Sequence, residues 1–108
     1  MKPTLNAIYI KPSTDNLGYQ MTAFFIQGQV TKDFLDSLDM ESLWNKARDL
    51  ITPAYDTMYL EGYEIEYQSN IGRTAITLVR FNFITNRIKE KMDIIISNAN
   101  RIRENFHG

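Results

Sequence analysis

The apolar side chains near the C-terminal end of the chain recur at alternating intervals of four and three residues. This spacing predicts an amphipathic helix that begins near Thr85 and presents a narrow apolar stripe. The stripe spans only about three heptads, so packing on a sheet is favoured over a coiled coil. The rest of the chain must therefore provide a surface that buries it. The stripe comprises Ile88, Met92, Ile95, Ala99, Ile102 and Phe106, and Ile84 and Ile96 widen it.

The chain begins with a predicted β-hairpin. Segments 5–11 and 19–30 are rich in Ile, Tyr, Phe, Thr and Val, and the turn-forming residues 12–18 separate them. Along the second segment, both alternating sets of side chains are apolar, which predicts a strand inside the sheet. The two sets are Met21, Ala23 and Phe25 on one face, and Phe24 and Ile26 on the other.

A helical region follows this hairpin. Thr31 is placed to cap a short first turn, and Asp39 to cap a second, longer segment. Pro53 disfavours helical geometry at Thr52, so the helix should end there. Helical spacing assigns Trp44 to the core. The first turn holds Phe34, Leu35 and Leu38, and the apolar face of the second segment holds Leu43, Trp44, Ala47, Leu50 and Ile51.

Segments 57–68 and 73–83 are predicted to form a second hairpin around a four-residue loop at 69–72. In this register Glu61 pairs with Arg80, which favours it over a slip by one residue. Both faces of this hairpin are apolar. One face carries Tyr63, Ile65, Tyr67, Ile76 and Leu78, and the other carries Met58, Leu60, Val79, Phe81 and Phe83.

The predicted order of elements is strand, strand, helix, strand, strand, helix. A four-stranded antiparallel sheet with both helices on one face buries the apolar stripes of these elements most simply. With 108 residues, 44% of them hydrophobic and 23% charged, the chain has the size and composition of one globular domain. We therefore expect a single α+β domain over residues 1–108.

The second hairpin is expected to leave an apolar surface uncovered, because two helices cover only one face of the sheet. A monomer rarely exposes such a patch, and tyrosine-rich surfaces with a polar rim are typical of interfaces. The alternative is that sheet twist or the loop at 12–18 covers the patch within the monomer. The expected partner-binding residues are Tyr63, Ile65, Tyr67, Ile76 and Leu78, with Glu61 and Arg80 at the rim.

The sequence lacks the residues that most catalytic and metal sites use. There is no cysteine, and the only histidine is His107, so thiol chemistry and a histidine pair for a metal are excluded. The five glycines form no phosphate-binding loop, and the serines lack the context of a nucleophile. Glu64 and Glu66 share a strand face, where an acid–base role is the alternative to solubilising an edge strand. We therefore expect no enzyme activity, no cofactor and no metal.

Charge is divided unevenly along the chain. Residues 1–69 carry ten acidic and five basic side chains, whereas residues 70–108 carry seven basic and three acidic ones. Arg87, Lys89 and Lys91 lie in the first turns of the last predicted helix, where anions are favoured, and form a candidate phosphate site. The alternative function is nucleic-acid binding by the sheet tyrosines and this basic helix. The pI near 5.8 and the glutamates beside the tyrosines argue against it.

No apolar run reaches the length of a signal-peptide core or a membrane span, so we expect a cytoplasmic protein without membrane contact. The absence of cysteine agrees with a reducing compartment. These features predict a small non-catalytic protein that binds other protein, including a second copy of itself in a homodimer. Accessory factors, inhibitors, immunity proteins and phage products are small proteins of this kind.

Overall fold

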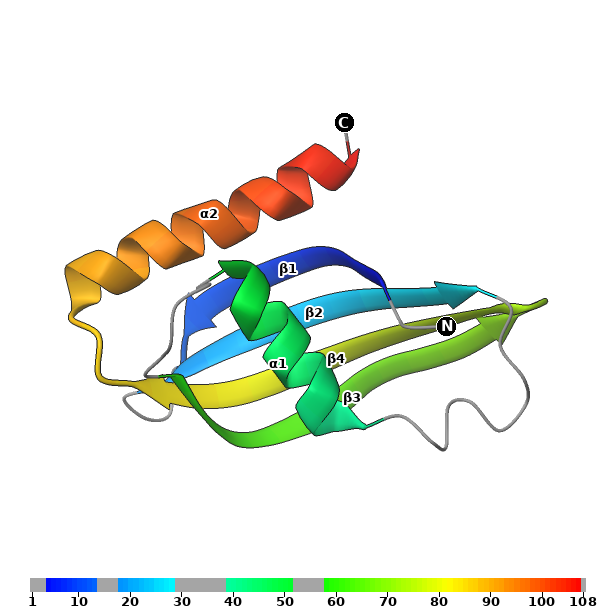
Figure 1. Cartoon of the computed structure of the whole chain (residues 1–108), viewed down its shortest axis with the longest axis horizontal. Helices are drawn as coiled ribbons and strands as arrows, with labels where there is room; N and C mark the ends of the chain where they lie inside the picture. Colours follow the sequence, from blue (N-terminus) through cyan, green and yellow to red (C-terminus); the bar gives the residue numbers. More distant parts are fainter. Residues whose placement is uncertain (1–3, 14–17, 29–38, 52–57, 108) are drawn as a thin grey trace.

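The computed structural model describes residues 4–13, 18–28, 39–51 and 58–107, with side chains described as far as Ala99. Six elements follow one another in the order β-β-α-β-β-α (Figure 1). They form a four-stranded antiparallel sheet with two helices, so the predicted α+β fold is confirmed. The elements are β1 (Thr4–Pro12), β2 (Tyr19–Gly28), α1 (Met40–Ile51), β3 (Met58–Ile71), β4 (Thr74–Thr85) and α2 (Lys89–His107).

Strand β2 lies inside the sheet, as its two apolar faces predict. The order across the sheet is β1-β2-β4-β3, and each neighbouring pair is antiparallel. Met21, Ala23 and Phe25 of β2 are buried in the core, whereas Phe24 and Ile26 are half-buried on the opposite face. The strand therefore supplies apolar side chains to both sides of the sheet.

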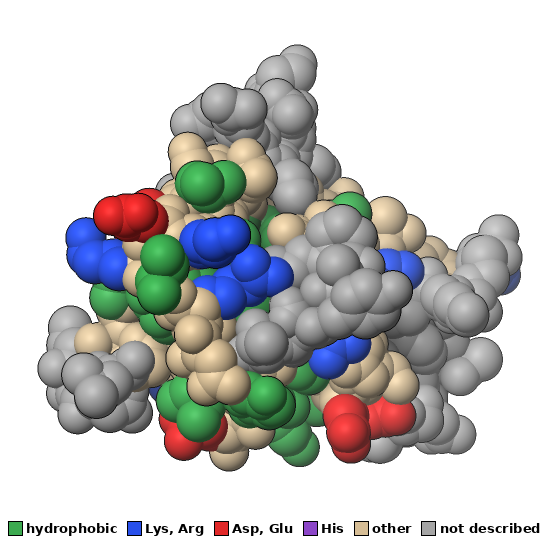
Figure 2. Space-filling view, turned by 60° about the vertical axis from the view of Figure 1, so that its left-hand side comes forward, with side chains coloured by type: hydrophobic (Ala, Val, Ile, Leu, Met, Phe, Trp, Pro, Cys, Tyr) green, Lys and Arg blue, Asp and Glu red, His purple; other side chains and the backbone are tan. Residues whose placement is uncertain are grey.

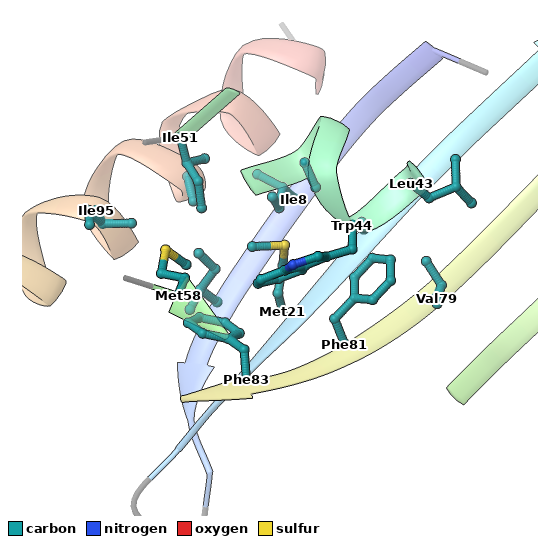
Figure 3. Packing of buried hydrophobic residues seen from close by; sticks show 14 of the residues in the cluster. Ile8, Met21, Leu43, Trp44, Ile51, Met58, Val79, Phe81, Phe83 and Ile95 are labelled. Atoms are coloured by element: carbon teal, nitrogen blue, oxygen red, sulfur yellow. The ribbon is translucent and has the colours of Figure 1, made fainter. Parts of the chain in front are cut away.

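Both helices pack on the same side of the sheet. α1 crosses the sheet diagonally, and α2 runs along β1 (Figure 1). Buried residues from both helices and all four strands form a single hydrophobic cluster. Within it the Trp44 ring packs against Phe81 and Phe83, with centroid separations of 5.5 and 5.3 Å (Figure 3). The predicted place of Trp44 in the core is confirmed.

Three residues of the predicted apolar helix faces are exposed instead, and one of them, Ile84 at 40%, belongs to β4 rather than to the last helix. Leu50 of α1 is 53% exposed, whereas its neighbour Ile51 is buried. Ile88 is 60% exposed, because β4 continues to Thr85 and α2 begins only at Lys89. The stripe of α2 is buried at Met92, Ile95 and Ala99. The predicted cap at Thr31, the first turn with Phe34, Leu35 and Leu38, and the side chains of Ile102 and Phe106 lie outside what the structure describes.

The N-terminus of α1 is capped by Asp39, as predicted. The Glu41 amide donates to Asp39 Oδ1 at 3.1 Å, and the Ser42 hydroxyl donates to Asp39 Oδ2 at 2.8 Å. The hydrogen bond from the Ser42 side chain is the main reason that the pKa of Asp39 lies below its ordinary value. The helix therefore starts on a carboxylate that is held in its charged form.

Removal of this cap should destabilise the protein in a pH-dependent way. Asp39→Ala removes the acceptor for the Glu41 amide and the Ser42 hydroxyl, whereas Asp39→Asn keeps a capping oxygen and should retain most stability at neutral pH. The pKa of Asp39 is lower in the folded state than in the unfolded state. Its stabilisation of the folded protein is therefore complete above the unfolded-state pKa and is lost as the pH falls through the folded-state pKa. Thermal melts from neutral pH down to about pH 2 should show a larger acid-induced loss in the wild type than in Asp39→Asn. Identical pH profiles for the two proteins would contradict this role of the carboxylate.

The turn of the second hairpin is tighter than predicted. Gly72 and Arg73 form a two-residue turn, and Gly72 has a φ of 62°, a left-handed conformation that favours glycine. β3 and β4 therefore pair from Ile71 and Thr74 onward, and the predicted four-residue loop is wrong.

Strand β3 contains two single-residue insertions relative to β4. The pairing shifts at Glu61 and again at Glu66, so neither glutamate has a residue directly opposite. Each insertion reverses the alternation of side chains along β3. Together with the tighter turn, the insertions place Glu64 rather than Glu61 opposite Arg80, so the predicted register is wrong.

Candidate protein-binding face

The face of the sheet opposite the helices, called the open face here, carries apolar side chains from all four strands. Residues directly opposite one another in an antiparallel ladder share a face of the sheet. The pairing therefore places four apolar side chains in one row across the sheet and two more in the adjacent row of β2 and β4. These six residues, called the apolar band, are Ala7, Phe24, Leu78 and Tyr67 in the first row and Ile26 and Ile76 in the second.

No helix in the described part of the chain covers the apolar band, because both helices pack on the other side of the sheet (Figure 1). Tyr67 is 54% exposed, and Ile76 and Leu78 are half-buried. Beyond the band, at the end of the hairpin, Ile71 is 64% exposed. An apolar surface that extends across a whole sheet commonly marks a site of interaction.

The charged side chains beside the apolar band neutralise one another. Arg80 forms an ion pair with Glu64 and a second one with Glu66, in which Nη1 lies 3.0 Å from Oε1. The predicted pairing of Arg80 with Glu61 is wrong, because the insertions in β3 bring Glu64 opposite Arg80. An exposed ion pair contributes only about 0–1 kcal/mol to stability, so its main effect is to reduce the charge of the open face.

The structure divides the predicted binding residues between the two faces of the sheet. Tyr63 lies opposite Phe81 and Ile65 opposite Val79, and both partners are core residues, so Tyr63 and Ile65 belong to the helix side. They are exposed as predicted, at 52% and 40%, but the prediction that they share a surface with Tyr67 is wrong. The predicted residues that do lie together on the open face are Tyr67, Ile76, Leu78 and Arg80.

Half of the apolar band was missed by the sequence-based prediction of the site. Ala7, Phe24 and Ile26 come from the first hairpin, and Tyr9 of β1 lies in the row beside them. The sequence feature that could have revealed these residues is the apolar pattern on both faces of β2. Because β2 lies between β1 and β4, its outward side chains continue the surface that the second hairpin begins.

The predicted anion-binding residues lie around the start of α2. Lys89 and Lys91 are in its first turn, and Arg87 precedes it, with its amide donating to Thr85 Oγ1 at 3.1 Å. Figure 2 shows Lys and Arg side chains gathered beside exposed apolar side chains at this end of the molecule. Lys89 Nζ lies 3.6 Å from Asp93 Oδ2. Basic residues at a helix start do not by themselves define a site, so phosphate binding stays a prediction.

No family model, curated protein or solved structure matches the chain. Within the described residues, no three His, Asp or Glu side chains are grouped so as to hold a metal ion. In the same part of the chain, neither helix combines the length and the apolar character needed to cross a membrane.

Proposed function

We propose that the protein is a non-catalytic interaction protein that binds other protein molecules, a second copy of itself included, through the open face. The observation that carries this proposal is the apolar band, which extends over all four strands with no described helix above it. An apolar centre that includes an exposed tyrosine, with charged residues beside it, is the composition of a protein–protein interface. The second hairpin supplies half of this surface, as the sequence suggested.

The arrangement of charge and tyrosines favours a protein partner over a nucleic acid. The guanidinium of Arg80 already holds the carboxylates of Glu64 and Glu66, which would repel phosphate groups. Tyr63 and Tyr67 lie on opposite faces of the sheet, so they do not form one platform on which successive bases could stack. The sequence pI near 5.8 means that the chain is not positively charged at neutral pH, which disfavours binding to the phosphate backbone of a nucleic acid.

The solution mass of the purified chain tests the proposal. Light scattering after size-exclusion chromatography should give about 25 kDa, twice the 12.6 kDa of the chain, since a two-fold dimer is the commonest symmetric assembly. A mass of 12.6 kDa at every accessible concentration would contradict self-association. Salt-sensitive binding of a single-stranded oligonucleotide, weakened by charge reversal at Arg87 and Lys91, would favour the nucleic-acid alternative instead.

A further inference from the structure

We infer that the second copy packs its open face against the open face of the first, so that the dimer is a two-layered sheet with helices on both outer sides. This inference rests on the proposed function and specifies how the open faces of the two copies meet.

The edges of the sheet oppose the other simple mode of self-association, in which edge strands pair. α2 runs along β1, at one edge of the sheet. The other edge is β3, where the insertions at Glu61 and Glu66 interrupt the ladder and place exposed carboxylates along the strand. Insertions and charged side chains are the features by which natural sheets prevent edge pairing. Packing of a second copy on the open face is therefore favoured over pairing with an edge strand.

The open face has the dimensions that a stable dimer needs. The sheet has four strands. At about 4.8 Å between strands and about 3.3 Å per residue over about ten residues, the face measures about 19 by 33 Å, or about 600 Å² in flat projection. A specific interface buries about 800 Å² of accessible surface per partner, and the accessible area of a side-chain surface exceeds its flat projection. Contact over most of the open face is thus sufficient.

The balanced charge of the open face is compatible with a second copy of the chain as the partner. The pairing of the strands places Lys11, Arg80 and Glu64 on this face, and the ion pair with Arg80 brings the carboxylate of Glu66 to it, so two basic groups stand beside two acidic ones. Two such faces do not repel each other when they meet. A strongly acidic or strongly basic partner would gain no electrostatic attraction there.

The side-chain pattern of the open face is complementary to itself. A two-fold axis parallel to the strands, midway between β2 and β4, exchanges these two strands and also exchanges β1 with β3. It places Tyr67 of each copy over the small Ala7 of the other, and Ile26 over Ile76. At the centre of the band Phe24 then faces Leu78, at each edge the large Tyr67 faces a small residue, and in the second row the β-branched residues face each other, so apolar side chains meet along the whole band.

A matched pair of tyrosines on β3 tests this arrangement. Tyr67 and Tyr63 are 54% and 52% exposed and lie four residues apart, but they belong to opposite faces of the sheet. Tyr67→Lys should raise the dimer dissociation constant by about 30-fold or more, because it places an unpaired charge in the apolar contact between the two copies. Tyr63→Lys should change it by less than about 3-fold. Ala7→Lys, on the opposite edge of the sheet, should weaken the dimer as Tyr67→Lys does.

Sedimentation equilibrium of the full chain and the three variants gives the dissociation constants, and circular dichroism confirms that each variant is folded. A wild-type dimer that Tyr63→Lys and Tyr67→Lys weaken equally, and that Ala7→Lys leaves intact, would place the contact at the β3 edge. That result would overturn the face-to-face arrangement and the use of the open face, and would leave self-association itself standing. A dimer that none of the variants weakens would do the same, whereas a monomeric wild type would overturn both proposals.

Discussion

Phe81→Ala is expected to lower the free energy of unfolding by about 3–5 kcal/mol, the range for truncating a fully buried phenylalanine. Phe81 has no exposed surface, and its ring centroid lies 5.5 Å from that of Trp44, so the substitution leaves a cavity at the centre of the core (Figure 3). Small domains are stable by only about 5–15 kcal/mol, so this variant should approach the limit of folding. Urea denaturation followed by far-UV circular dichroism and by the fluorescence of Trp44 measures the change.

Tyr59→Ala is the control for this substitution. Tyr59 is an aromatic residue of the edge strand β3 and is 52% exposed, so its truncation removes little buried surface. It should cost no more than about 1 kcal/mol, the span of strand preferences at exposed sites. If the two variants lost similar stability, Phe81 would not occupy the centre of the core.

Met92→Asp is expected to detach α2 from β1 and to cost at least about 3 kcal/mol at neutral pH, because it buries an unpaired carboxylate. Met92 is fully buried in the cluster that joins α2 to the strands. The cost should shrink as pH falls, because a protonated carboxyl group is less costly to bury than a charged one. Denaturation curves at neutral and acidic pH, with hydrogen exchange of β1 as a local probe, measure both effects.

Ile94→Asp is the matched control, since it introduces the same side chain two residues further along the same helix. Ile94 is 62% exposed, so the new carboxylate stays in water. We expect a change within about 0.5 kcal/mol, as for an ordinary surface substitution. A large loss in Ile94→Asp would mean that α2 is sensitive to any added acid, and the assignment of Met92 to the interface between α2 and β1 would then lose its support.

The fold was predictable where the spacing of apolar side chains fits a helix or a strand but not both. The helical spacing around Trp44 placed that ring in the core, and the apolar pattern on both sides of β2 placed this strand inside the sheet. The late start of α2 at Lys89 was not predictable, because β4 continues its pairing as far as Thr85 and nothing in the apolar spacing marks where this pairing ends. Tertiary pairing overrode the local helical pattern there.

The candidate site was predictable only in part, because two insertions decide which face each residue of β3 occupies. The sequence does not show that Glu61 and Glu66 are insertions with no residue opposite them on β4. It also does not distinguish a two-residue turn from a four-residue loop, and this choice sets the register of the hairpin. Tyr67 was therefore assigned to the correct face, whereas Tyr63 and Ile65 were not. The contribution of Phe24 was visible in the pattern of β2 but was not connected with the second hairpin, since the order of strands was needed to join them.

The two inserted glutamates of β3, which have no residue opposite them on β4, also affect how partly folded chains behave. A chain without Glu61 and Glu66 would keep every remaining side chain on its present face, because each insertion adds a residue without changing the order of those around it. Its β3 would then be an uninterrupted strand along the edge of the sheet. Such a strand is a template on which incoming chains can extend a fibril without limit. The two insertions thus oppose the growth of open-ended polymers from misfolded chains.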